Sequence, residues 1–247
     1  VQTCALPNYF SEDKGLALKG QLSSMEWEDL THFEGNANAF RLLTHQFLGR
    51  RKGGFVMTYS TLASIVKYPY PSILAGKKSK FGYFVSEMDD YLKIAEELGI
   101  KRLSTEGEVP LYARHPLVFL VEAADDICYQ MMDIEDAYKL KLLTPRETKE
   151  LYQLFLSEKQ KARVDEVFRL VSDENEQIAY LRATVIGILV KECTKVFMEN
   201  ENSILKGTFE GALIKHINAP LNEAYKRCTQ VAVEKIYRSR DVLDIEL

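Results

Sequence analysis

The sequence predicts an all-α fold. Long segments place apolar residues at the 3.6-residue spacing of helices, and strand-like alternation is scarce. The composition is that of a globular protein, with 46% hydrophobic and 28% charged residues, which excludes a disordered or fibrous chain. The sequence has no internal repeat and no obvious linker. We therefore predict a single helical domain over residues 1–247.

Glycine, proline and capping residues mark where the helices begin and end. Gly49 and Gly99 each close an apolar segment, because glycine readily adopts the left-handed conformation that ends a helix, and Pro69 stops another. Ser86 is a suitable N-cap, and Thr144 opens the capping box T-P-R-E with proline at the first helical position. We therefore expect helices over residues 34–49, 58–68, 86–98, 116–139, 145–155, 173–200 and 220–239.

Cysteine usage and apolar run lengths indicate the compartment. The four cysteines are scattered and form no C-x-x-C pair, which argues against a disulfide framework or a zinc knuckle and favours a reducing, cytoplasmic location. No run of about 18 apolar residues occurs, so we expect no membrane span and no membrane partner. The sequence begins at Val1 with neither an initiator Met nor a signal peptide, and we expect it to be a piece of a longer protein.

The segment from Arg41 to Tyr83 is strongly basic. It contains eight Lys and Arg residues and no Asp or Glu, in a chain whose formal net charge is -4. Such a block indicates an anionic partner, although a solvated basic face is the simpler interpretation. The aromatic residues interleaved with these cations suit a nucleotide or a nucleic-acid strand, in which phosphates are attached to flat bases. They are Tyr59, Tyr68, Tyr70 and Tyr83.

The helix predicted over 116–139 combines apolar surroundings with a stripe of carboxylates. Its sequence, PLVFLVEAADDICYQMMDIEDAYK, is apolar on most faces, so we expect it in the core. The stripe has no Lys or Arg between its acids, whereas exposed faces usually mix signs because like charges one turn apart repel. It is either the solvent face of the helix or the wall of a site for a metal and a polar substrate. The polar residues within its arc of roughly 100° are Glu122, Asp125, Asp126, Tyr129, Asp133 and Asp136.

Four strings of the sequence carry a family resemblance. F-E-G-N-A occupies residues 33–37, I-V-K-Y 65–68, K-F-G-Y-F-V-S-E 80–87 and E-A-A-D-D-I-C-Y 122–129. In this order they resemble the dGTP triphosphohydrolases (dGTPases) of the HD-domain superfamily, and the resemblance covers nearly the whole chain. It implies an all-α, HD-domain-like fold that hydrolyses dGTP or another dNTP to a deoxynucleoside and inorganic triphosphate with a divalent metal, Mg or Mn. It also implies a homo-oligomer, for which segments 144–171 and 173–200 offer helix faces.

The resemblance gives roles to individual residues. Asp125 matches a metal-binding aspartate, Tyr129 a tyrosine that packs against the deoxyribose, and Asp133 an aspartate that bonds the sugar 3′-hydroxyl. Helix geometry agrees, because positions i, i+4 and i+8 share a face. The residues that match the phosphate pocket are Asn36, Lys67, Tyr68 and Lys80, and Glu246 matches a glutamate that reads the base.

The histidines depart from the family pattern. The family's metal-binding histidine, its His-Asp pair and its catalytic histidine precede the F-E-G-N-A string, and no His-Asp dipeptide occurs in this chain. One aspartate cannot hold a catalytic divalent ion alone. We therefore expect the catalytic residues to lie upstream of this stretch and the stretch alone to be inactive. We interpret His32 and His115 as structural residues.

Two other functions stay open. A helical module could bind single-stranded DNA or RNA through the basic segment 41–83 by charge and stacking, but this leaves the acidic stripe unexplained. A helical scaffold could use the stripe and the basic segment as complementary interaction faces. Salt dependence separates nucleic-acid binding from metal-dependent hydrolysis, which a chelator should abolish.

Overall fold

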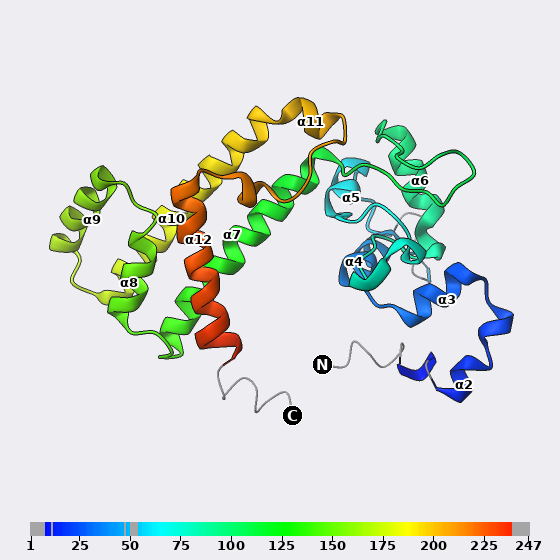
Figure 1. The fold of residues 1–247 in the computed structure, drawn as a ribbon, viewed down its shortest axis with the longest axis horizontal. Coiled ribbons are helices and arrows are strands. Elements are labelled where there is room, and N and C mark those ends of the chain that lie inside the picture. Colours follow the sequence, from blue (N-terminus) through cyan, green and yellow to red (C-terminus); the bar gives the residue numbers. More distant parts are fainter. Residues whose placement is uncertain (1–7, 11, 47, 50–53, 239–247) are drawn as a thin grey trace. The chain divides into compact units, whose positions relative to one another are not determined.

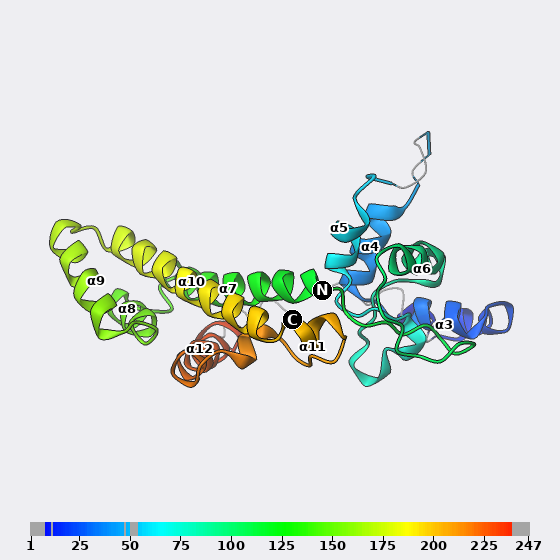
Figure 2. The same ribbon diagram turned by 90° about the horizontal axis from the view of Figure 1, so that it is seen from above.

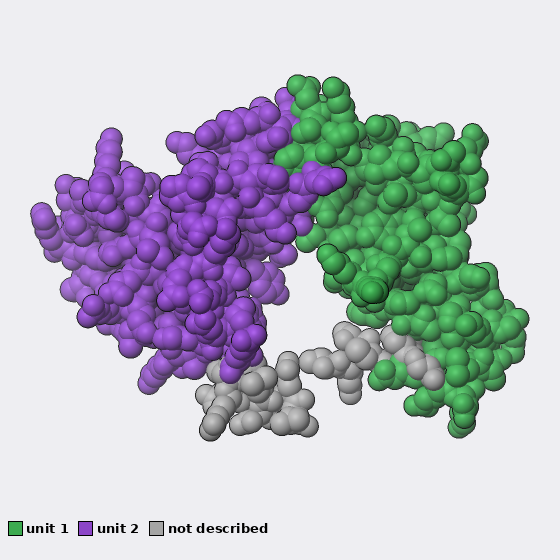
Figure 3. Space-filling model, viewed as in Figure 1, with its two compact units in different colours: residues 1–121, 202–209 green, residues 122–201, 210–247 purple. Residues whose placement is uncertain are grey.

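The computed structural model describes residues 8–10, 12–46, 48–49 and 54–238. Within these ranges the regular elements are all helical and no strand occurs, which confirms the predicted all-α class. Two isolated bridges join Pro71 to Tyr83 and Arg102 to Tyr112. The chain divides into two compact units: unit 1 comprises residues 1–121 and 202–209, and unit 2 comprises residues 122–201 and 210–247 (Figure 3). The single domain expected over 1–247 stays a prediction.

Unit 1 is a group of short helices joined by 3-10 turns (Figure 1). Its main core packs Phe40 and Leu62 against Tyr83, Tyr91 and Ile94, all of which are nearly or fully buried. The rings of Tyr83 and Tyr91 stack with their centroids 4.6 Å apart. The helices of this unit are α2 (Asp13–Leu16), α3 (Ser24–Thr31), α4 (Gly35–Thr44), α5 (Tyr59–Ile65) and α6 (Met88–Glu97), with most of α11 (Glu201–Leu205).

The helix boundaries in unit 1 differ from the predicted ones. Helix α4 ends at Thr44 and not at Gly49. Ser86 does not cap α6, because it lies inside the 3-10 turn η5 (Val85–Glu87) that precedes this helix. The cause is a tertiary contact: Asp29 Oδ2, on α3, accepts a hydrogen bond of 2.7 Å from the Val85 amide and so holds the start of that turn.

Unit 2 is built around α7 (Pro116–Lys139), whose bounds match the predicted 116–139 and whose first turns belong to unit 1. Figures 1 and 2 show α10 and α12 beside α7. The Tyr152 hydroxyl of α8 donates to the Met131 carbonyl at 2.8 Å, and Arg182 of α10 forms an ion pair with Glu135. The helices around α7 are α8 (Pro145–Gln153), α9 (Glu158–Leu170), α10 (Glu174–Glu199) and α12 (Ala219–Ala232).

Helix α7 has one buried and one exposed apolar face. Val118, Phe119, Ile127, Met131 and Ile134 are buried. The exposed apolar side chains of the helix are Leu117, Leu120, Val121, Cys128 and Met132. A smaller part of the α7 surface is therefore buried than its apolar composition predicts. No helix in the described part of the chain is both long and apolar enough to cross a bilayer.

Candidate functional site

The residues predicted to bind the metal and the sugar lie on one side of α7, in unit 2. Asp125 and Tyr129 are exposed, and the tyrosine retains 66% of its accessible surface. Asp133 is half-buried, and its Oδ2 atom accepts a hydrogen bond of 2.5 Å from the Tyr237 hydroxyl. This bond, together with burial, raises the pKa of Tyr237 to about 12. The face therefore offers an exposed aromatic ring next to an oriented carboxylate.

The described side chains do not complete a metal centre at Asp125. Asp126 follows it on the helix, about 100° around the axis, so the two carboxylates point apart. Among the described residues, no group of three or more His, Cys, Asp and Glu side chains could hold a metal ion. A divalent cation takes several oxygen ligands. Asp125 therefore supplies a single exposed carboxylate, and its role as a metal ligand stays a prediction.

In unit 1, two of the predicted phosphate-binding residues meet at the buried carboxylate of Glu34. This residue is only 3% exposed and caps the N-terminus of α4, where it accepts hydrogen bonds from the amides of Asn36 and Ala37. Its Oε1 atom accepts the Asn36 side-chain amide at 3.2 Å and the Lys80 ammonium at 3.0 Å. Glu34 was predicted only as the first residue of the helix over 34–49, although an acid at the start of a helix is a capping signal.

The other two predicted residues lie beside one another at a second cation. Lys67 Nζ and Arg114 Cζ are each 5.9 Å from the ring centroid of Tyr68, within the range of cation–π attraction. The ring centroids of Tyr68 and Tyr70 are 6.3 Å apart. The pKa of Tyr70 is raised, mainly by burial; Tyr68 and Glu34 raise it further, and Arg114 lowers it. Arg114 was not predicted as a site residue, because it lies outside the segment 41–83.

Together these residues form what we call the basic-aromatic cluster of unit 1. It combines positive groups and aromatic rings with one buried acid, a set of side chains suited to anionic groups attached to a flat ligand. It consists of Glu34, Asn36, Lys67, Tyr68, Tyr70, Lys80 and Arg114.

Gly82 permits the close approach of the two segments that carry this cluster. A Cβ atom at this position would lie 2.1 Å from the Tyr68 carbonyl oxygen and 2.6 Å from Val66 Cγ1. The Gly82 amide donates to the Tyr70 carbonyl at 3.0 Å, which ties the segments together. The glycine of the K-F-G-Y string is therefore required for the packing of this string against Val66 and Tyr68.

Part of the basic segment 41–83 serves the fold itself. Lys80 pairs with Glu34, and Arg41 Nε lies 3.8 Å from the buried Glu87. Both acids lie just outside the segment, so counting charges inside it overstates the unpaired positive charge. Tyr83, one of the four tyrosines interleaved with these cations, is fully buried in the core. Arg50, Arg51 and Lys52 lie outside the described residues, whereas Lys77 and Lys78 are exposed.

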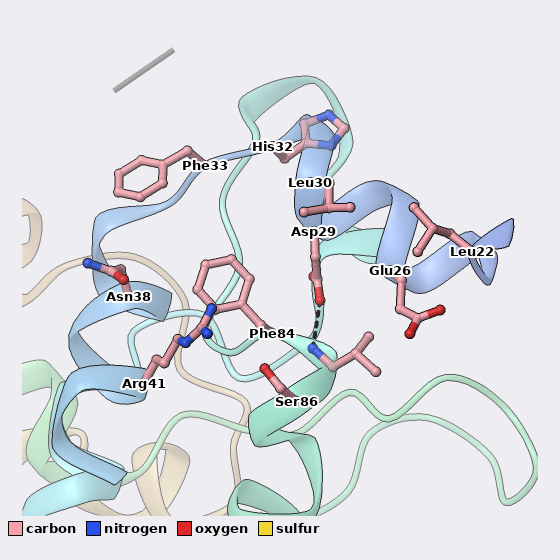
Figure 4. A pocket seen from close by; sticks show the side chains of 11 residues that line it. Leu22, Glu26, Asp29, Leu30, His32, Phe33, Asn38, Arg41, Phe84 and Ser86 are labelled. Carbon is pink, nitrogen blue, oxygen red and sulfur yellow. Dashed lines mark hydrogen bonds between the residues drawn. The ribbon is translucent and has the colours of Figure 1, made fainter. Parts of the chain in front are cut away.

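Unit 1 also has a cavity of about 510 Å³ that the sequence did not predict (Figure 4). Its wall combines the aromatic rings of Phe33 and Phe84 with charged side chains, and the Arg41 guanidinium lies 5.9 Å from the Phe84 ring centroid. Figure 4 shows Asp29 directed towards the amide of Val85. Burial raises the pKa of Asp29, and the hydrogen bond from Val85 opposes this shift. None of the described residues predicted for the site lines this cavity.

The two histidines that we interpreted as structural make local contacts. His115 Nδ1 accepts the Leu117 amide at 3.3 Å and so caps the start of α7, while burial lowers its pKa. His32 Nδ1 lies 3.0 Å from a carboxylate oxygen of Glu28, one turn earlier on α3. Glu246, predicted to read the base, lies outside the described residues.

No protein-family model matches the chain. The chain is 33% identical over 243 residues to the "Deoxyguanosinetriphosphate triphosphohydrolase-like protein" of Pseudomonas aeruginosa (strain LESB58), a match that covers 96% of this chain and 53% of that protein. It is 34% identical over 224 residues to the protein of the same description in a Synechocystis species, with 87% and 48% covered. The chain thus spans about half the length of the curated relatives it matches.

Proposed function

We propose that this chain, a homologue of the deoxyguanosinetriphosphate triphosphohydrolase-like proteins, is part of an enzyme that hydrolyses dGTP or another dNTP to a deoxynucleoside and inorganic triphosphate. The observation that carries the proposal is the 33% identity over 96% of the chain. In the reaction a water oxygen bonds to the α-phosphorus, the bond from phosphorus to the sugar 5′-oxygen breaks, and that oxygen takes up a proton.

In this proposal α7 binds the deoxyribose. The exposed ring of Tyr129 packs flat against the sugar at C2′, which leaves no room for a ribonucleotide's 2′-hydroxyl. Discrimination then arises from a steric clash and not from a lost hydrogen bond. Asp133, one turn further along the same face, accepts a hydrogen bond from the 3′-hydroxyl.

The basic-aromatic cluster binds the triphosphate. Negative charge grows on the α-phosphate oxygens as water attacks, and the ammonium groups of Lys67 and Lys80 stabilise this charge electrostatically. The contact with Glu34 occupies one of the three N–H donors of Lys80, so donors remain for phosphate oxygens. Asn36 and Tyr68 lie beside these cations and complete the phosphate-binding surface.

The family also implies a divalent metal, Mg or Mn. The described donors do not fit a complete centre for it, since Asp125 presents one carboxylate and no group of three or more suitable donors forms among the described residues. The work proposed for this chain is therefore substrate binding and orientation by its own side chains.

Product analysis tests the proposed function in the complete natural polypeptide that carries this sequence. With dGTP we expect equal amounts of deoxyguanosine and triphosphate. Tyr129→Ala should raise the hydrolysis of GTP relative to dGTP, because it removes the ring that excludes the 2′-hydroxyl. Asp136→Ala, an exposed change two turns further along α7, is the matched control. Release of orthophosphate or pyrophosphate from dGTP would contradict the proposal.

Binding of single-stranded DNA through the segment 41–83 stays the alternative. The exposed Lys77 and Lys78 favour it, whereas the pairing of Arg41 and Lys80 with buried acids weakens it. Affinity for an oligonucleotide should fall steeply with salt if this alternative holds. Binding that is absent at low salt would exclude it.

A further inference from the structure

Three hydroxyl groups of the C-terminal helical segment contact α7, the first two at the same sequence offset of 99 positions and the third at 104. Tyr225 Oη donates to the Asp126 carbonyl at 3.0 Å, and Thr229 Oγ1 donates to the Gln130 side chain at 2.6 Å. Further along, the Tyr237 hydroxyl donates to Asp133 Oδ2 at 2.5 Å. Residue numbers rise together along both segments, so they run in the same direction, and Figure 1 shows α12 beside α7. The third contact falls on a residue predicted to bind the sugar.

Tyr237 reaches α7 because the helix changes type. A π-helical turn, Val233–Tyr237, directly follows α12. In a regular α-helix, a residue twelve positions after Tyr225 would point about 120° away from it. A π turn is wider, so each residue rotates less around the axis, and Tyr237 returns towards the face that carries Tyr225 and Thr229. Such turns occur frequently at functional sites.

The contact leaves half of the Asp133 carboxylate for a ligand. An ionised carboxylate accepts hydrogen bonds at both oxygens, and the Tyr237 hydroxyl engages Oδ2. A hydrogen bond to a charged acceptor is stronger than a neutral one and holds the acceptor in one orientation. Tyr237 is a donor at neutral pH, as any tyrosine with the ordinary pKa of about 10 would be. The bond to Asp133, then burial, and then the nearby Asp133 and Tyr129 raise its pKa further, to about 12.

We propose that Tyr237 is a positioning residue for deoxyribose binding, whose hydroxyl orients Asp133 so that the other carboxylate oxygen accepts the substrate 3′-hydroxyl. The inference rests on the proposed function, which supplies the deoxynucleotide. Tyr237 acts through Asp133, so its hydroxyl matters only for substrates that carry a 3′-hydroxyl. This selectivity distinguishes positioning from general support of the fold.

The first test compares dGTP with 2′,3′-dideoxy-GTP, which lacks only the 3′-hydroxyl, in the complete natural polypeptide. Tyr237→Phe should lower kcat/KM for dGTP about tenfold and leave the value for the dideoxy substrate within about twofold. The matched control is Tyr225→Phe, which removes a hydroxyl from the same segment that bonds a backbone carbonyl, and it should affect both substrates equally. Equal losses on both substrates with Tyr237→Phe would overturn the proposal.

The second test is spectroscopic and needs no turnover. Tyrosine labelled with ¹³C at Cζ reports ionisation by NMR, and the Tyr237 signal is the one absent in Tyr237→Phe. Asp133→Asn should shift the Tyr237 titration down towards the ordinary value of about 10, and an unchanged titration would overturn the contact. If the wild-type protein releases no triphosphate from dGTP, both the proposed function and the positioning role are wrong. If the wild type is active but Tyr237→Phe lowers kcat/KM equally for both substrates, only the positioning role is wrong.

Discussion

Glu34 connects two of the residues predicted to bind phosphate, and its burial makes Lys80 important for stability as well as for binding. Lys80→Ala removes the cationic partner of a carboxylate that is 3% exposed. Because the Glu34 carboxylate keeps its two backbone amide donors and the Asn36 side-chain amide, and Lys80 is itself half-exposed, we expect a loss of about 1–2 kcal/mol in the free energy of unfolding. Urea denaturation measures it.

The matched control for this prediction is Lys78→Ala, which changes an exposed lysine of the same segment. A loss no larger than that of Lys78→Ala would show that the pair with Glu34 contributes nothing. In the complete enzyme, Lys80→Ala should also raise KM for dGTP, lower kcat, or both, since a charged contact can act in the ground state or the transition state. Unchanged kinetics would remove Lys80 from the phosphate site.

His115 gives a prediction about pH. Burial lowers its pKa below the ordinary value of 6.5, so the folded state favours the neutral imidazole that caps α7. The resulting stabilisation is present above about pH 6.5 and is lost as the pH falls through the lower pKa of the folded state. His115→Asn keeps a capping side chain that does not ionise, so it should lose less stability between pH 7 and pH 5 than the wild type.

Unfolding free energies at pH 7 and pH 5 check this prediction. His216→Asn is the control, because His216 contacts a backbone carbonyl at a different helix boundary. If the wild type and His115→Asn lose the same stability on acidification, His115 does not couple to folding.

At the scale of elements, the packing of segment 66–70 against 80–84 depends on Gly82. Gly82→Ala would place a methyl group 2.1 Å from the Tyr68 carbonyl oxygen, so backbone must move. We expect a loss of about 1–3 kcal/mol in unfolding free energy, the usual cost of overpacking, and a displaced Tyr68 ring. Gly35→Ala is the control, since a Cβ there meets nothing within 4 Å. Equal stability of the two variants would contradict the prediction.

The capping box of α8 is a local element that the sequence predicts and the structure confirms. Thr144 Oγ1 accepts the Glu147 amide at 3.2 Å, and the Glu147 side chain accepts the Thr144 amide at 2.8 Å. Helix α3 has the same device at Ser23 and Glu26, yet it was not predicted, because it buries no side chain fully and its apolar period is weak. Capping signals therefore identify short helices that hydrophobic periodicity does not.

At the scale of the whole molecule, ligand counting predicts what the chain can do alone. The described residues bring together no group of three or more metal-binding side chains, and the relatives are about twice as long as this chain. We expect the 247-residue chain to release no triphosphate from dGTP with Mn or Mg, and a natural protein of the relatives' length to do so and to lose activity with EDTA. Metal-dependent turnover by the short chain at a comparable rate would show that other residues complete the centre.

The sequence by itself determined the helical class, the bounds of α7 and the order of the family strings. These features are local: helical periodicity and capping act between residues three or four positions apart, and a polar stripe on one helix face follows from spacing alone. The placement of Asp125, Tyr129 and Asp133 on one side of α7 was predictable for the same reason.

Only the tertiary structure decided which charged and polar side chains contact one another. Glu34 and Lys80 are 46 positions apart in the chain, and Asp133 and Tyr237 are 104 apart. No local period links such residues, because their contact depends on how loops return and on where a π turn rotates a side chain. The burial of Tyr83 and the pairing of Arg41 with Glu87 have the same origin. The basic segment was visible in the sequence, but its share of unpaired charge was set by acids that packing brought to it.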